Sequence, residues 1–150
     1  MIVKTTRITN KAPDAVWRGI TNAEMILPQP IFFRVGIPLP VKCEIVSFSD
    51  GVGRKRKCTS DKGSVFQEIT KFIENQELEF HMEYNTLEIP YTVKSMSDHF
   101  QIGIMPNGKT VVTRTTEIKI AGDPLMIKSL TVRFGIKAVH RYVFNNIDAA

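Results

Sequence analysis

The sequence predicts an α+β fold in which a curved antiparallel sheet wraps around one long C-terminal helix. Several successive segments between residues 42 and 85 show the two-residue alternation of strands, with short turns between them. Residues 123–147 then carry an apolar pattern with helical spacing. A chain of 150 residues is long enough to bury a substantial core, so we expect residues 1–150 to form a single domain.

The N-terminal segment predicts a strand followed by two short helices. Residues 3–10 alternate modestly and include β-branched side chains, which favours a strand. Pro13 fits the first turn of a helix, and Asp14 complements the positive end of its dipole. A second helical turn is expected over residues 23–27. The prolines of residues 28–40 then predict a stiff, irregular segment.

A four-stranded meander is predicted after this segment. Gly-containing turns at residues 50–51 and 61–63, and an Asn-containing turn at 74–76, separate its strands. The expected strands cover residues 42–49, 53–60, 64–73 and 77–85.

The turn lengths predict which side chains share a face of this meander. A three-residue loop at 61–63 pairs Arg56 with Glu68, and the turn at 74–76 pairs Glu68 with Met82 and Phe72 with Leu78. The resulting face is apolar with a few polar groups set into it, which suits a pocket for a small amphipathic molecule. Its three expected rows are Cys58–Phe66–Tyr84, Arg56–Glu68–Met82 and Arg54–Thr70–Phe80.

Cys43 and Cys58 are the only cysteines. A turn at Asp50–Gly51 pairs Ser49 with Val52 and places the two cysteines opposite one another. Directly paired strand residues sit somewhat wider than disulfide geometry prefers, and a reducing compartment is expected, so free thiols are favoured over a disulfide. Two cysteines are too few for a structural metal site and no histidine lies at ligand spacing, so no metal is expected. No phosphate-binding Gly loop or nucleotide fingerprint is visible, and no cofactor is expected.

Two further strands and a helix complete the prediction. Residues 86–98 show no clear strand pattern, whereas 99–105 and 109–120 do, and Arg114 falls on the inner face of the last strand. The helix of residues 123–147, capped by Asp123, is apolar on two flanks. The first flank is Leu125, Val132, Ile136, Val139, Val143 and Ile147, and the second is Met126, Leu130, Phe134 and Phe144. The second flank is expected either to pack within the subunit or to meet a partner, including a second copy in a homodimer.

The charge pattern favours a small-molecule partner over a nucleic acid or a membrane. The net charge is +5, but the basic residues are scattered except for the run 54–57, which a strand divides between its two faces. The start MIVKTTRITN lacks the apolar core of a signal peptide, and no window approaches ~18 uninterrupted apolar residues. We therefore expect no nucleic-acid partner, no stable membrane insertion and a cytoplasmic location.

Several segments resemble one known superfamily. APDAVWRGIT, after a first strand, is similar to the opening of the SRPBCC superfamily, which holds START lipid-transfer domains, pollen-allergen-like proteins and polyketide cyclases. GIPLP, GVGRKRKC, FQEITKF and LEFHM resemble the middle of polyketide-cyclase-like members, and GKTVVTRTTE and AVHRYVFNNI resemble their ends. The order of elements is that of the helix-grip fold. The resemblance implies a deep cavity between the sheet and the last helix that holds an apolar or amphipathic ligand.

The leading functional hypothesis is therefore the binding of a small hydrophobic or aromatic ligand, lipid- or polyketide-like, in an internal cavity. Two alternatives stay open. One is a cyclase or dehydratase in which Glu68 acts as the base and Arg56 or Arg114 stabilises an oxyanion, although no catalytic signature of the superfamily maps onto named positions. The other is a co-chaperone-like protein-interaction module. The predicted cavity residues are Arg56, Phe66, Glu68, Thr70, Phe80, Met82, Tyr84, Phe100, Ile102 and Arg114.

The roles of the individual polar residues stay open as well. Arg56 and Glu68 form either a ligand anchor or acid–base pair in the pocket, or a structural ion pair across two strands. Arg114 either binds a ligand carboxylate or enolate, pairs with Glu68, or extends to solvent. Among the histidines, His81 is expected to be exposed and His140 to serve as a structural hydrogen-bond donor. Trp17 is expected to be a core residue.

Overall fold

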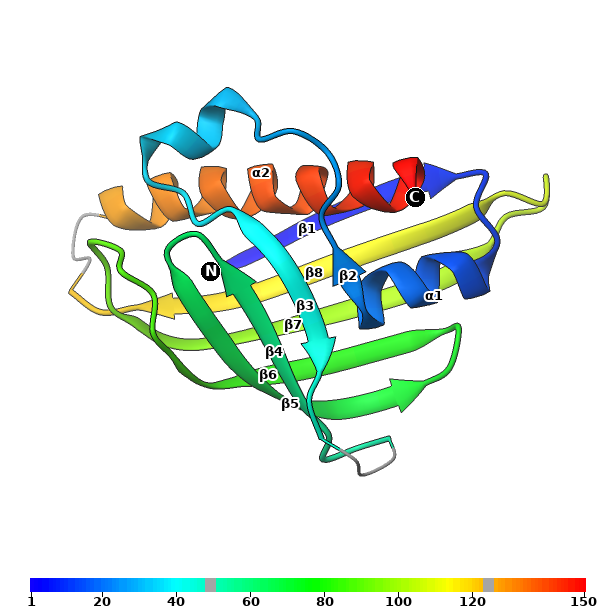
Figure 1. Ribbon diagram of the computed structural model, residues 1–150, viewed down its shortest axis with the longest axis horizontal. Coiled ribbons are helices and arrows are strands. Elements are labelled where there is room, and N and C mark those ends of the chain that lie inside the picture. Colours follow the sequence, from blue (N-terminus) through cyan, green and yellow to red (C-terminus); the bar gives the residue numbers. More distant parts are fainter. Residues whose placement is uncertain (48–50, 123–125) are drawn as a thin grey trace.

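The computed structural model describes residues 1–47, 51–122 and 126–150, and it describes residues 32 and 35 by their backbone alone. Within these residues, eight strands form one antiparallel sheet in the order β1-β8-β7-β6-β5-β4-β3-β2 (Figure 1). The first strand therefore pairs with the last. The strands are β1 Ile2–Thr9, β2 Ala23–Glu24, β3 Pro40–Ile45, β4 Lys55–Ser60, β5 Gly63–Ile73, β6 Glu77–Asn85, β7 Val93–Ile104 and β8 Thr110–Ile120.

Two α-helices and one 3-10 helix accompany the sheet. α1 is Pro13–Thr21, the 3-10 helix η1 is Ile31–Val35, and α2 is Ile127–Ala149. The long α2 runs along the sheet, and α1 lies beside its C-terminal half (Figure 1). This arrangement is the helix-grip fold, so the predicted fold class is confirmed. The predicted cap at Asp123, the apolar position of Leu125 and the pairing of Ser49 lie outside the described residues.

The core fills the space between the sheet and the two α-helices. Val16 and Ile20 of α1 are at most 1% exposed, and Phe144 of α2 is equally buried. Trp17 packs edge-on against Phe72 with 5.1 Å between the ring centroids, so its expected place in the core is confirmed. Burial of such large apolar side chains is the main source of stability for this layer.

The predicted helical turn at residues 23–27 is wrong. Ala23–Glu24 is the short strand β2, and the second helical element is η1, further along the chain. A side chain of α2 explains the difference, because Asn146 Oδ1 accepts hydrogen bonds from the backbone N–H groups of Ile26 at 2.7 Å and Leu27 at 2.9 Å. The segment thus satisfies its backbone through a tertiary contact that local sequence preference does not encode.

The register between β4 and β5 differs by one residue from the prediction. Ser60 pairs with Gly63, so the loop contains two residues rather than three. Arg56 consequently faces Gln67 instead of Glu68, and Cys58 faces Val65 instead of Phe66. Because neighbouring strand residues point to opposite faces, a slip of one residue exchanges the inner and outer sets of β5.

Two irregularities shift the register between β5 and β6, one between Phe66 and Gln67 and the other between Ile69 and Lys71. Phe72 pairs with Leu78, as predicted, but Thr70 is an extra residue between the pairs formed by Ile69 and Lys71. The expected partner of Met82 was Glu68, yet Met82 pairs with Gln67. Such bulges reverse the alternation of a strand, which is why Phe72 and Ile69 both reach the core although three positions separate them.

The seventh strand is longer than predicted. β7 begins at Val93 rather than at residue 99, and it pairs with β8 along nearly its whole length. This extension brings Asp98 onto the same face as Phe100, and both are 2% exposed. The alternation of residues 99–105 predicts an inward position for Ile104, at the other end of β7, but Ile104 is 68% exposed and this prediction is wrong.

The two flanks of α2 have different environments. Val143 and Ile147, from the first flank, are buried in the core, as is Phe144 from the second. Three other members of the second flank are more than half exposed: Met126, Leu130 and Phe134. The second flank therefore turns inward only at its C-terminal end.

Candidate functional site

A hollow of about 230 Å³ lies between the sheet, α2 and the segments at residues 36–40 and 87–93. A cavity that holds a single water needs a volume of roughly 10–15 Å³, so this hollow is much larger than a water site. Most of its wall is apolar. The apolar side chains from α2 and from the two segments include Ile37, Leu87, Ile89, Val132, Ile136 and Val139.

One group of polar side chains on the wall is centred on Asp98. Arg114 donates to the Asp98 carboxylate from Nε at 2.9 Å and from Nη2 at 3.1 Å. The Thr116 hydroxyl also hydrogen-bonds to this carboxylate, and it lies 2.8 Å from His140 Nε2. His140 Nδ1 is 2.9 Å from the hydroxyl of Thr5. The chain of contacts therefore joins β7, β8, α2 and β1.

Burial and charge tune the protonation of this group. Burial by itself raises the pKa of Asp98, but the charge of Arg114 and the hydrogen bonds from Arg114 and Thr116 outweigh it, so the pKa is lowered overall. Burial and the charge of Arg114 lower the pKa of His140 to about 3, against the opposing effect of Asp98. At neutral pH Asp98 is therefore an anion and His140 is uncharged, in accordance with the expected structural role of His140.

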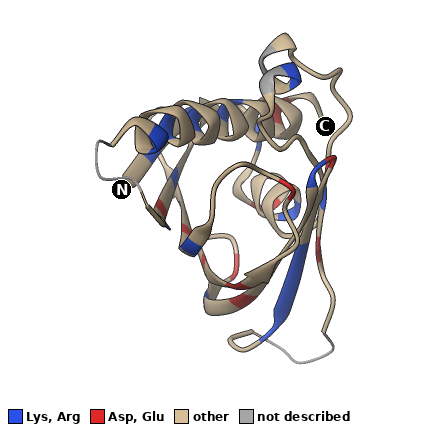
Figure 2. Cartoon of the chain, turned by 90° about the vertical axis from the view of Figure 1, so that its left-hand side faces the viewer, with Lys and Arg blue, Asp and Glu red and all other residues tan. Residues whose placement is uncertain are grey.

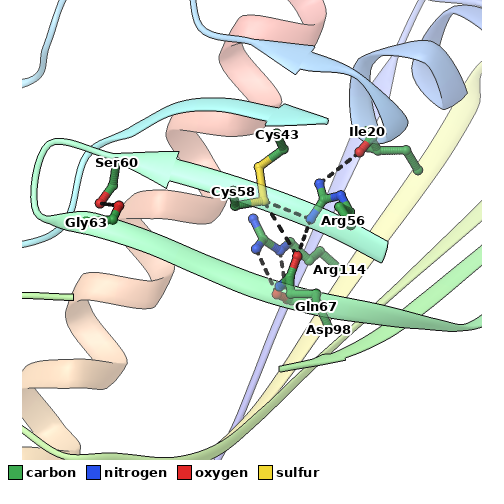
Figure 3. The surroundings of a disulfide bond; sticks show 9 residues. All are labelled: Ile20, Cys43, Arg56, Cys58, Ser60, Gly63, Gln67, Asp98 and Arg114. Atoms are coloured by element: carbon green, nitrogen blue, oxygen red, sulfur yellow. Dashed lines mark hydrogen bonds and ion pairs between the residues drawn. A yellow bond between two sulfur atoms is a disulfide. The ribbon is translucent and has the colours of Figure 1, made fainter. Parts of the chain in front are cut away.

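Arg56 forms the second polar group. Its Nη1 donates to Gln67 Oε1 at 2.8 Å and its Nη2 to the carbonyl of Ile20 at 3.0 Å, as Figure 3 shows. The guanidinium carbon also lies 4.3 Å from the ring centroid of Phe80, a cation–π contact. Burial and the nearby charge of Arg114 lower the pKa of Arg56 to about 9, although Asp98 raises it. Arg56 therefore remains a cation at neutral pH.

A disulfide between Cys43 and Cys58 lines the hollow beside Arg56 (Figure 3). The predicted pairing of the two residues is confirmed. The expectation of free thiols is wrong, because the Cα atoms are only 4.1 Å apart, close to the spacing of the narrower kind of antiparallel pair. Arg56 Nη1 lies 2.9 Å from Cys58 Sγ.

The structure distributes the ten predicted cavity residues over three environments. Arg56, Phe100 and Arg114 lie on the wall of the hollow. Phe80 is buried in the core, Ile102 packs against the core, and Met82 is half-buried opposite Gln67. None of these three residues is part of the wall. The other four, Phe66, Glu68, Thr70 and Tyr84, lie on the outer face or at the bulge of β5, because the register differs from the predicted one.

Glu68 forms an ion pair on the outer face of the sheet. Its carboxylate is 2.6 Å from Lys55 Nζ, and its side chain is 43% exposed. The Lys55 hydrogen bond lowers the pKa of Glu68, and the same contact raises the pKa of Lys55. Glu68 is thus neither the partner of Arg56 nor a base in the hollow, so the cyclase mechanism that relied on it is contradicted.

The outer aromatic pair belongs to the same face as Glu68. Phe66 and Tyr84 stack with 4.3 Å between their centroids, and Lys57 Nζ lies 5.6 Å from the Phe66 ring. The basic run of residues 54–57, one continuous blue stretch in Figure 2, divides between the two faces of the sheet as predicted. Lys55 and Lys57 point outward, whereas Arg56 points into the hollow.

Asp98 and Gln67 are polar residues of the wall that the predicted set of cavity residues does not contain. Asp98 precedes Phe100 by two positions, so a strand extended toward the N-terminus would have placed both on one face. Gln67 was assigned to the outer face because of the register error. His99 is turned outward, where Nε2 lies 2.5 Å from a Glu77 carboxylate oxygen, and His81 is exposed as predicted.

Residues 1–47, 51–122 and 126–150 contain no group of three or more His, Cys, Asp or Glu side chains that could hold a metal ion. Over the same ranges, no helix has the length and apolar character needed to cross a membrane.

Comparison with known proteins identifies relatives by structure. No family model matches the chain. No curated protein matches its sequence. Among solved structures, ginseng major latex-like protein 151 from Panax ginseng is similar with a TM-score of 0.70 and 11% identity, over 99% of this chain and 95% of that one.

Two bacterial structures show the same likeness. A START superfamily protein from Mycobacterium smegmatis has a TM-score of 0.67 and 8% identity, over 99% of this chain and 94% of the other. A protein from Mesorhizobium loti has a TM-score of 0.66 and 17% identity, over 99% and 95% of the two chains. The match extends over nearly the whole length in each case, and the resemblance noted in the sequence is confirmed at the level of the fold. This protein has the helix-grip fold of the SRPBCC superfamily.

Proposed function

We propose that this protein binds a small hydrophobic or aromatic molecule, lipid- or polyketide-like, in the hollow between the sheet and α2. The observation that carries the proposal is the wall itself, which is mostly apolar with a few polar groups converging on one region. Ligand sites in proteins typically combine these features, because apolar area supplies affinity and the polar groups orient the ligand. The helix-grip fold supports the proposal by leaving this space between the sheet and its last helix.

Binding is favoured over catalysis by the state of the polar groups. The carboxylate on the wall, Asp98, accepts two hydrogen bonds from Arg114 and one from Thr116, and its pKa is lowered. A carboxylate held as an anion in this way is a weak proton acceptor. His140 has both ring nitrogens in contact with threonine hydroxyls. These groups are thus arranged to hold one another in place.

Native mass spectrometry of freshly purified protein tests the proposal. We expect a species heavier than the bare 17.0 kDa chain that loses a small molecule on activation. A Val139→Phe variant, which adds bulk to the wall from α2, should lose this species. Val41→Phe is the matched control, because Val41 is 45% exposed and lies outside the wall.

Two results would contradict ligand binding in the hollow. The first is a bare chain in every preparation that also fails to gain thermal stability with any hydrophobic probe. The second is an adduct that persists equally in Val139→Phe and Val41→Phe, since the molecule would then bind elsewhere.

A further inference from the structure

The charges around the hollow do not balance. Its wall carries two guanidinium groups, Arg56 and Arg114, but Asp98 is the one carboxylate on it within the described residues. His140 is uncharged at neutral pH and adds nothing to the sum. One positive charge therefore remains without a counter-charge in a mostly apolar space.

The surplus charge belongs to Arg56. Asp98 is held by Arg114 through two hydrogen bonds in fork geometry, at 2.9 and 3.1 Å, and by the Thr116 hydroxyl. No carboxylate of the described chain lies within ion-pair distance of Arg56, whereas Arg114 has its partner in Asp98. Asp98 interacts with Arg56 only electrostatically, at a distance beyond an ion pair.

The contacts of Arg56 are all with uncharged groups. Its acceptors are Gln67 Oε1, the Ile20 carbonyl and Cys58 Sγ, and its Nε has no acceptor in the described residues. The residue is only 5% exposed, so water does not compensate for the missing anion. Burying an ion without a counter-ion is costly, and a bound anion would reduce this cost.

We propose that the ligand is an amphipathic anion whose carboxylate group pairs with Arg56, while its apolar body extends along the wall formed by α2 and residues 87–93. This inference rests on the proposed function and adds the chemical class of the ligand to it. A carboxylate matches a guanidinium in charge and in planar hydrogen-bonding geometry, and it would neutralise the surplus charge that the protein alone leaves. Cys58 of the disulfide and Gln67 both contact Nη1 of Arg56 (Figure 3), and Arg56 is part of the wall of the hollow.

Matched pairs of probes test the charge of the ligand. Octanoate and 4-phenylbutanoate are compared with their primary amides, octanamide and 4-phenylbutanamide, by isothermal titration calorimetry at pH 7.5. Each pair has the same apolar body, and the amide replaces one oxygen of the anionic carboxylate with an uncharged NH2 group. The protein is kept free of reductant, because a Cys58 thiolate beside Arg56 would supply a competing negative charge.

Variants then assign the preference to Arg56. We expect the wild type to bind at least one carboxylate about tenfold or more tightly than its amide, the range of a charge-assisted hydrogen bond. Arg56→Gln should reduce this ratio to about one, and Arg56→Lys should retain a preference for the carboxylate. Lys57→Met is the matched control, because it removes the same charge from the next position of β4 on the outer face. It should bind both probes like the wild type.

The possible failures are distinguishable. If the amide binds as tightly as the carboxylate, or if Arg56→Gln keeps the wild-type ratio, the anionic ligand is excluded while ligand binding in the hollow stands. If neither member of either pair binds and native mass spectrometry shows a bare chain, the proposed function fails and the inference fails with it. If Arg56→Gln does not fold, Arg56→Lys decides: a lysine lacks the planar fork of arginine, so its carboxylate-to-amide ratio should fall below that of the wild type while Lys57→Met keeps the wild-type ratio. An unchanged ratio in Arg56→Lys, or a lost preference in Lys57→Met, would exclude the assignment.

Discussion

At the scale of the residue, buried polar groups determine how this protein responds to its surroundings. Arg56, Asp98 and His140 are each at most 5% exposed, and each depends on a small number of named partners. Such groups cost free energy when their partners are lost, because water cannot replace them. Their behaviour is therefore measurable in stability as well as in binding.

His140 should make the protein sensitive to mild acid. Its pKa is lowered from 6.5 to about 3 on folding, so the unfolded chain binds a proton at a pH where the folded chain does not. Stability is then fully present above pH 6.5 and falls as the pH decreases toward 3. Between pH 7 and 4.5 we expect the free energy of unfolding to decrease by about 2 kcal/mol from this residue.

Urea titrations at pH 7 and pH 4.5 measure this effect. His140→Gln should lose markedly less stability over the interval than the wild type, whereas His81→Gln, at an exposed histidine, should follow the wild type. Asp98 contributes stability that is present above its unfolded pKa of 3.8 and is lost as the pH falls through its lower folded pKa, so its contribution lies below this interval. Equal losses in His140→Gln and the wild type would contradict the prediction.

At the scale of the element, side chains from α2 organise the segment between α1 and β3. Asn146 accepts from the backbone of Ile26 and Leu27, and the hydroxyl of Tyr142 donates to the carbonyl of Leu27 at 2.9 Å. The same segment leads to Ile37, whose side chain lies close to Gly135 of α2. α2 thereby holds in place part of the chain that surrounds the hollow.

Removal of the Asn146 side chain should therefore destabilise the fold. Asn146→Ala leaves two backbone N–H groups without an acceptor, for which we expect a loss of about 2 kcal/mol in the free energy of unfolding. Asn145→Ala is the matched control, since Asn145 is exposed and contacts Arg7 at the surface. It should change stability by about 0.5 kcal/mol or less. Similar losses for both variants in chemical denaturation would refute the role given to Asn146.

At the scale of the whole molecule, three apolar side chains at the N-terminal end of α2 are more than half exposed. Met126, which directly precedes α2, is 66% exposed, and Leu130 and Phe134 of α2 are 68% and 54% exposed. Phe144, predicted for the same flank, is buried because the C-terminal half of α2 packs against α1 and the sheet. Exposed apolar side chains in a row on one helix are typical of a surface that meets another protein.

We predict that this surface mediates a homodimer. Sedimentation equilibrium of the wild type should give an average mass above 17.0 kDa that rises with concentration, whereas Leu130→Glu should give the monomer mass. Lys137→Glu, another exposed position of α2, should behave like the wild type. A wild-type protein that is monomeric at all concentrations would contradict the predicted homodimer.

What the sequence determined by itself is the set of elements and their order. Alternation of apolar residues identified most of the sheet, and helical spacing identified α1 and α2, because both patterns depend on the local geometry of the chain. The pairing of Cys43 with Cys58 was also predictable, since a short turn sets the register near itself. Trp17 was placed correctly in the core for the same local reason, its position on the apolar side of α1.

Only the tertiary structure decided which polar residues meet in the hollow. The extra residue at Thr70 and the two-residue loop before Gly63 place Gln67 on the inner face instead of Glu68. The alternation of apolar residues along the sequence reveals neither the bulge nor the loop length. The meeting of Asp98 with Arg114 required pairing of β7 with β8 beyond the segment whose own pattern predicted a strand. Register and bulges depend on the partner strand rather than on the strand itself, so the chemistry of the wall emerges only when the sheet is assembled.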